Sequence, residues 1–182
     1  GDELGNGFVV YSGEGTEVTL TGLKGRTQYF FTAYSFLESE GQAPNYRQAD
    51  SAAVTVVTKL GVPESNVSVT VDQVNISGSI VNLFITSQGE GVLGLLKEAE
   101  PITAIPDNNV FYFADNNFSG NGDGLSDGSK AIFNNNSVFT WSLSTYGLKE
   151  NTTYYYKFFN YSADGNIILY NPLPDSGFFK TK

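Results

Sequence analysis

Four side chains in a polar stretch of the chain have the types and spacing of calcium ligands. Residues 119–127 read Ser-Gly-Asn-Gly-Asp-Gly-Leu-Ser-Asp, which places Asn121, Asp123 and Asp127 as in a calcium-binding loop. Asp115 lies near enough in sequence to add a carboxylate. A serine occupies the first ligand position of the loop and no bidentate glutamate follows, so an ordinary Gly/Asn/Asp turn is the competing interpretation.

Other chemistry is restricted by composition. The chain has no Cys, no His and no Met, which excludes thiol nucleophiles, imidazole bases, the usual zinc sites and disulfides. Carboxylates such as Glu98 and Glu100 lie close in sequence, but no nucleophile elbow, phosphate loop or convergent basic group accompanies them. We therefore predict that the chain is not an enzyme and that it needs no cofactor, with calcium as the one candidate.

The net charge of the chain limits the classes of partner that it can bind. The net charge is −9 and the pI is about 4.3, so a phosphate backbone or an anionic membrane surface would repel the chain. No apolar run reaches the length of a membrane span. We expect no nucleic acid and no membrane insertion, and we expect the partners to be other domains or copies of the parent protein, or a glycan.

The elements that carry these residues are predicted to be strands. Hydrophobic residues make up 40% of the chain and charged residues only 16%, and the short apolar runs alternate with period two. The expected strands include residues 8–11, 17–21, 28–36, 53–58, 67–71, 80–85, 92–96, 131–133, 138–143, 153–161, 167–170 and 178–180. We predict an all-β chain of antiparallel β-sandwich units.

An internal repeat organises these strands. Residues 22–31 align without a gap on residues 147–156, and residues 2–11 resemble residues 123–133. In the second copy a block from about Val67 to Gly122 precedes the shared part. We therefore predict that residues 1–60 are the C-terminal half of a unit whose first strands are missing, and that residues 61–182 are a complete unit with a long insertion at about 106–128.

A motif of Leu, Thr and Tyr recurs in both copies and is followed each time by an aromatic strand. It resembles the corner before strand F of fibronectin type III domains, where related sandwiches bond a Tyr hydroxyl back to nearby backbone. The resemblance implies a fibronectin type III-like, immunoglobulin-like sandwich with one such corner in each unit. The corner residues are Leu23, Thr27, Tyr29, Leu148, Thr152 and Tyr154.

A narrower resemblance is to the type III-like repeats of large secreted and cell-surface proteins of Bacteroidota. It is carried by the string from Gly7 to Tyr46 and by the aromatic run from Tyr154 to Tyr161. It implies a secreted or surface location in a bacterial envelope. Asp50-Ser51-Ala52 resembles the short O-glycosylation motif of such proteins, which makes Ser51 a candidate glycosylation site.

Two functional interpretations follow. The first is a structural or adhesive repeat of a surface protein, with strand complementation of the half unit and filament formation as a consequence. The second is a carbohydrate-binding accessory or spacer module of a secreted glycan-degrading enzyme, for which an exposed aromatic row beside a groove is the expected sign. Trp141 is expected in the core, because it alternates in phase with Leu143.

Overall fold

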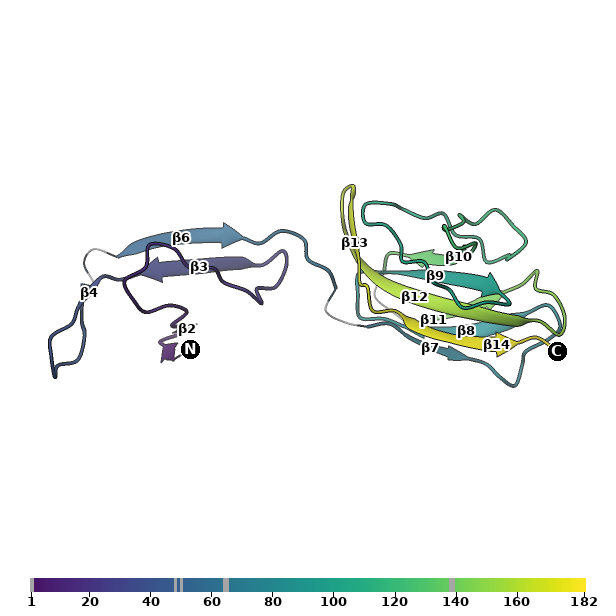
Figure 1. The fold of residues 1–182 in the computed structure, drawn as a ribbon, viewed down its shortest axis with the longest axis horizontal. Coiled ribbons are helices and arrows are strands. Elements are labelled where there is room, and N and C mark those ends of the chain that lie inside the picture. The colour runs from purple at the N-terminus through teal and green to yellow at the C-terminus, as the bar shows by residue number, and fades with distance from the viewer. Residues whose placement is uncertain (1, 48, 50, 64–65, 138–139) are drawn as a thin grey trace. The chain divides into compact units, whose positions relative to one another are not determined.

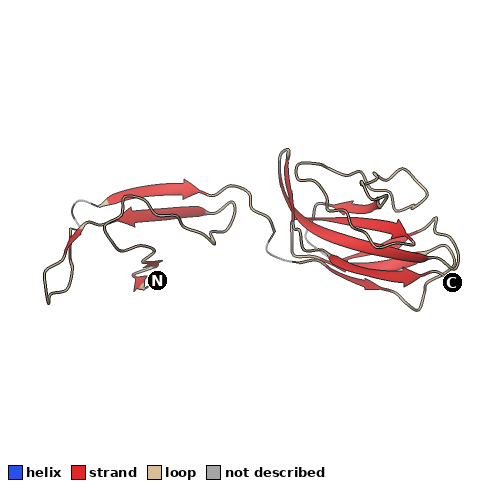
Figure 2. Cartoon of the chain, viewed as in Figure 1, coloured by secondary structure: helices blue, strands red, loops and turns tan. Residues whose placement is uncertain are grey.

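The computed structural model describes residues 2–47, 49, 51–63, 66–137 and 140–182. The described residues form an all-β fold with no α-helix, and every pair of strands is antiparallel, as the sequence predicts (Figures 1 and 2). The chain divides into two compact units, Gly1–Lys59 (unit 1) and Leu60–Lys182 (unit 2). No helix among these residues is long and apolar enough to cross a membrane.

Unit 2 contains a three-stranded sheet with the order β11-β8-β7. Its strands alternate between buried apolar and exposed side chains, since successive residues point to opposite faces of a sheet. Val69, Leu83 and Leu143 lie on the inner face. The strands are β7 (Ser68–Val71), β8 (Val81–Thr86) and β11 (Thr140–Thr145).

The second sheet of unit 2 has five strands with the order β10-β9-β12-β13, and β14 also pairs with β12. The long strand β12 pairs with β14 through its first half and with β13 through its second half, while β9 lies along its other edge. The strands are β9 (Gly91–Glu98), β10 (Lys130–Asn135), β12 (Thr153–Asp164), β13 (Ile167–Tyr170) and β14 (Asp175–Lys180).

The two sheets of unit 2 pack face to face as a sandwich. Large side chains from both sheets fill the space between them, and Ile85, Tyr154 and Phe158 are completely buried there. Trp141 packs at the edge of this core with its ring centroid 5.6 Å from that of Phe133. Burial of the apolar area is the main stabilising contribution, at about 25 cal/mol per Å².

A long loop, residues 99–129, covers the outer face of the five-stranded sheet; Figure 1 shows it on the opposite side of β9 and β12 from β7 and β8. We call this loop the excursion. Ile102 and Tyr112 of the excursion pack with Leu93, Leu95 and Phe159 of the sheet, which makes a second core. Strand β9 is therefore apolar on both faces.

Unit 1 consists of three two-stranded antiparallel sheets, β1-β2, β3-β6 and β4-β5. Most of its side chains are exposed or half-buried, and none of the described ones is classed as buried. The strands are β1 (Glu3–Leu4), β2 (Gly7–Phe8), β3 (Gln28–Ala33), β4 (Phe36–Leu37), β5 (Asn45–Tyr46) and β6 (Ala52–Val57).

Two strand predictions in unit 1 are wrong. Residues 17–21 form no strand, and of residues 8–11 only Phe8 lies in one. The counterparts of these segments are β11 and β10, which pair with β8 and β9. A strand is stable only beside a partner, and the described part of unit 1 contains no counterpart of β8 or β9.

Candidate functional site

The same corner occurs in both units, with the same hydrogen bond. In unit 2 the backbone amide of Lys149 donates to the hydroxyl oxygen of Tyr154 at 2.9 Å. In unit 1 the amide of Lys24 donates to the hydroxyl oxygen of Tyr29, also at 2.9 Å. Each tyrosine hydroxyl thus fixes the turn five residues before it.

A threonine near the end of each unit completes the corner. The amide of Thr152 donates to the hydroxyl of Thr181 at 2.9 Å, and this hydroxyl donates to the carbonyl of Lys149 at 2.6 Å. In unit 1 the amide of Thr27 donates to the hydroxyl of Thr58 at 3.0 Å. Thr58 and Thr181 are not among the corner residues predicted from the sequence. The dipeptide Thr-Lys, which recurs at 58–59 and 181–182, is the signal that could have found them.

The turns themselves also match. Gly22 and Gly147 have φ angles of 73° and 71°, in the left-handed region that glycine adopts without steric cost. Arg26 and Asn151 have φ angles of 51° and 49° at the equivalent later position of the turn. Two different sequences between Leu and Thr therefore produce one backbone conformation.

The equivalence continues along the strands. Tyr29 lies opposite Val56 in the β3–β6 pair, as Tyr154 lies opposite Phe179 in the β12–β14 pair. The ring centroids of Phe36 and Tyr46 are 5.5 Å apart across β4–β5. Across β12–β13 the rings of Tyr161 and Tyr170 are 5.4 Å apart. Unit 1 thus repeats the corner of unit 2 and the strand pairings that follow it, although β3–β6 and β4–β5 are separate sheets.

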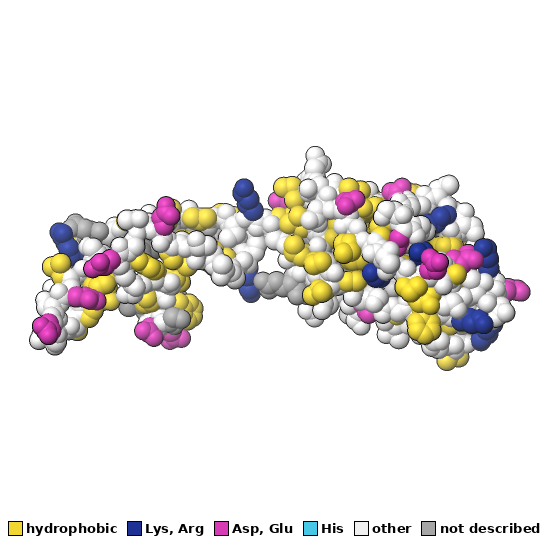
Figure 3. Space-filling view, in the orientation of Figure 1, with side chains coloured by type: hydrophobic (Ala, Val, Ile, Leu, Met, Phe, Trp, Pro, Cys, Tyr) yellow, Lys and Arg dark blue, Asp and Glu magenta, His cyan; other side chains and the backbone are white. Residues whose placement is uncertain are grey.

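The two copies differ in how much of their apolar side chains is exposed to solvent. Leu148 and Phe179 are 6% and 2% exposed in unit 2, whereas their counterparts Leu23 and Val56 are 39% and 44% exposed. Figure 3 shows hydrophobic side chains at the surface of unit 1. The apolar face of unit 1 is therefore the counterpart of a protein core rather than of a protein surface.

The backbone edge of β3 is open in the same way. In unit 2 the equivalent strand β12 lies between β9 on one side and β13 and β14 on the other. Among the described residues, β3 pairs only with β6. An unpaired edge beside an exposed apolar face is a template for another strand.

The candidate calcium ligands bind backbone amides of the excursion. Asp115 accepts hydrogen bonds from the amides of Asn117 and Asn121 at 2.9 and 3.0 Å. Asp123 accepts one from Phe113 at 2.7 Å. The side chains lie in one loop, and Asn121 meets Asp115 through its backbone. Within the described ranges, no three acidic, His or Cys side chains are grouped as a metal site requires.

Asp127 joins the two ends of the excursion. One carboxylate oxygen accepts from the amides of Thr103 and Ala104 at 2.7 and 3.0 Å, and the other from the amide and hydroxyl of Ser129. Burial alone would raise the pKa of Asp127, but the hydrogen bonds from Ser129, Ala104 and Thr103 outweigh it and hold the pKa well below its usual range.

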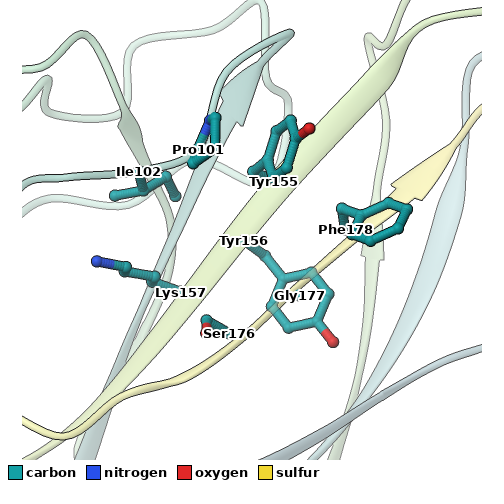
Figure 4. A pocket seen from close by; sticks show the side chains of 8 residues that line it. All are labelled: Pro101, Ile102, Tyr155, Tyr156, Lys157, Ser176, Gly177 and Phe178. Carbon is teal, nitrogen blue, oxygen red and sulfur yellow. The ribbon is translucent and has the colours of Figure 1, made fainter.

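An aromatic pair lies beside a shallow hollow on the outer face of unit 2 (Figure 4). Tyr155 of β12 and Phe178 of β14 have ring centroids 5.8 Å apart, and Phe178 is 65% exposed. Pro101 and Ile102 of the excursion and Lys157 of β12 also line the hollow. The hollow holds about 160 Å³, which is too small to enclose a ligand but sufficient for a surface contact.

Ser51, the candidate glycosylation site, is exposed immediately before β6. Its neighbour Asp50 lies outside the described residues.

No protein-family model matches the chain, and no curated protein matches it.

Proposed function

We propose that the chain is a non-catalytic structural or adhesive module of a secreted or cell-surface protein built from fibronectin type III-like units. The observation that carries this proposal is the repeated corner: Tyr29 and Tyr154 hold identical turns in two consecutive units. Repeats of one small sandwich are typical of proteins that act by spacing and by contact between neighbouring domains. The resemblance to Bacteroidota surface repeats supports the location.

The carboxylates support a structural role. Asp115, Asp123 and Asp127 accept hydrogen bonds from backbone amides of the excursion and so hold the loop in its folded shape. Tyr112 of this loop and Phe159 of the sheet below it are both buried. The polar stretch therefore serves to build a second core, which a spacer or adhesin needs for rigidity.

Unit 1 is proposed to be completed by strands from outside residues 1–182. Val9 and Val10 are exposed, although their counterparts Ala131 and Ile132 are buried in unit 2. Contiguous apolar surface of this kind marks an interaction site. Through these added strands the module would assemble with the polypeptide that supplies them.

The test compares the natural material with the isolated 182-residue chain. We expect antibodies against the chain to label intact source cells. We expect the β3 amides that do not face β6 to be protected from hydrogen exchange in the natural material and to exchange fast in the isolated chain. Light scattering with intact-mass spectrometry would identify what completes unit 1. An intracellular location, or an isolated monomer in which the β3 amides that do not face β6 are protected, would contradict the proposal.

Glycan binding is the second candidate, and the aromatic pair favours it. Tyr155 and Phe178 offer rings on which a sugar could stack, and Lys157 lies beside them. The test is a glycan array with the intact chain, followed by Phe178→Ala and by Phe84→Ala as the matched control. Phe84 is 44% exposed on the other sheet. Binding that survives Phe178→Ala, or no binding at all, would sink this candidate.

A further inference from the structure

The backbone groups that face the open edge of β3 can be identified from unit 2. There, the amide of Ala99, just after β9, donates to the carbonyl of Thr153 at 2.9 Å, whereas the amide of Thr181 donates to that of Thr152 on the β14 side. In unit 1 the amide of Thr58 donates to the carbonyl of Thr27. Successive residues of a strand face opposite edges, so Gln28, Phe30 and Thr32 face the open one.

We propose that this edge accepts one antiparallel β-strand from a polypeptide outside residues 1–182, and that three positions of that strand are specified by unit 1. This inference rests on the proposed function and goes further, because it defines the chemistry of the partner. The model for the incoming strand is β9, which occupies the equivalent edge of β12.

The first specified position is acidic. In unit 2 the residue opposite Tyr154 is Glu98, and its carboxylate binds the ammonium of Lys149 at 2.8 Å. Unit 1 has a lysine, Lys24, at the same place in its corner. In the described part of the chain no acidic side chain forms an ion pair with Lys24. The incoming strand is expected to carry Asp or Glu opposite Tyr29.

The second specified position is a large aliphatic residue. Leu96 lies opposite Tyr156 and is completely buried in the core. The counterpart of Tyr156 is Phe31, which is half-buried in unit 1. A leucine-sized residue opposite Phe31 would extend the same inner face.

The third specified position distinguishes the two units. Gly94 lies opposite Phe158, and a Cβ on Gly94 would overlap the Phe158 ring. In unit 1 the counterpart of Phe158 is Ala33, which is exposed and leaves the ring volume vacant. Packing at native density requires the volume to be filled from one strand or the other. The strand that fits unit 1 therefore carries a large apolar residue where β9 carries glycine.

The test uses the full chain and three labelled peptides on a soluble tag: the β9 sequence 91–98, the same peptide with G94L, and a G94L peptide that also carries E98K. We expect the G94L peptide to bind about tenfold more tightly than the parent peptide, because burying one leucine side chain has about that effect. The E98K change should weaken binding, and increasingly so at low salt. Fluorescence anisotropy gives the affinities.

A chain variant locates the binding edge. Thr32→Pro removes an amide that faces the open edge while leaving the hydrogen bonds between β3 and β6 in place, and Thr32→Val is the control that keeps the amide. We expect binding to be lost with Thr32→Pro and kept with Thr32→Val. A G94L peptide that is N-methylated at alternate residues tests the same hydrogen bonds without altering the chain, and it should not bind.

Hydrogen exchange separates the outcomes. Protection of β3 on addition of the G94L peptide supports the inference. Protection confined to β14, equal affinity of the parent and G94L peptides, or a dimer of the chain that occupies β3 without peptide would overturn it. If no peptide binds although β3 is protected in the natural material, the strand chemistry is wrong and the proposed function stands. Protection of the Gln28, Phe30 and Thr32 amides in the isolated monomer would contradict both the inference and the proposed function.

Discussion

The hydroxyl of Tyr154 accepts the backbone amide of Lys149 at 2.9 Å, and this bond is partly buried at the end of the unit 2 core. The matching bond between Tyr29 and Lys24 is exposed. The same contact is therefore expected to have a different energetic effect in the two units, since an unpaired polar group costs more in a buried place than in water.

Tyr154→Phe is expected to lower the free energy of unfolding of unit 2 by about 1–2 kcal/mol, because it leaves the Lys149 amide without its acceptor. Urea unfolding can be followed through Trp141, the one tryptophan of the chain, which lies in unit 2. Tyr29→Phe should leave this transition unchanged. An equal effect of both substitutions would show that the corner bond acts independently of the core.

The corner could be predicted from sequence because it depends on local residues. Leu, Thr and Tyr at fixed spacing determine one turn, whether Arg26 or Asn151 occupies the position with positive φ. The strand at residues 17–21 could not be predicted correctly, because a strand depends on a partner that lies far away in the sequence or outside it.

The hydrogen-bond partners of the acidic side chains could not be predicted for a similar reason. The spacing of Asp115, Asp123 and Asp127 fits a calcium-binding loop. The excursion folds back on itself, however, and its backbone amides donate hydrogen bonds to these carboxylates. The donors are the amides of Asn121, Phe113 and Thr103. The same fold-back covers one end of the outer face of β12. Phe159 is completely buried there, whereas Tyr155 stays half-buried beside Phe178.

Because Gly94 faces the Phe158 ring, we expect a larger residue at 94 and a smaller one at 158 to compensate for each other in unit 2. Phe158→Ala alone should cost about 3–5 kcal/mol by leaving a cavity. Gly94→Leu alone should cost about 1–3 kcal/mol or more by overpacking, since Gly94 has no positive φ and the atoms nearest to an added Cβ belong to the Phe158 ring. The double variant should be destabilised by about 1–3 kcal/mol less than the sum of the two single costs.

The measurement is a double-mutant cycle by urea unfolding. Ile76, which lies in the same core but in the loop between β7 and β8, gives the control: Ile76→Val with Gly94→Leu should show costs that add. Additive costs for Gly94→Leu and Phe158→Ala would contradict the size exchange that the further inference assumes.

Thr145 at the end of β11 is completely buried, and its hydroxyl has no hydrogen-bond partner within the described residues. Thr145→Val removes this hydroxyl and keeps the shape, so unit 2 should gain about 1 kcal/mol and melt at a higher temperature. Thr145→Ser keeps the hydroxyl and loses a methyl group, and it should destabilise the unit. A loss of stability in Thr145→Val would mean that the hydroxyl has a partner.

The lowered pKa of Asp127 predicts that the free energy of unfolding of unit 2 depends on pH. Its pKa is lowered in the folded state, so the carboxylate stabilises the fold above the unfolded-state pKa of about 4, and this contribution is lost as the pH falls below it. Asp127→Asn should cost about 1 kcal/mol at pH 7, a modest value because the group is partly exposed. The difference between wild type and variant should be smaller at pH 2 than at pH 7, because at pH 2 the unfolded state binds a proton that the folded carboxylate does not. Asp107→Asn, which alters an exposed carboxylate of the same loop, should have no effect at either pH. A cost for Asp127→Asn that is the same at both pH values would mean that Asp127 holds the excursion by shape alone and not by its charge.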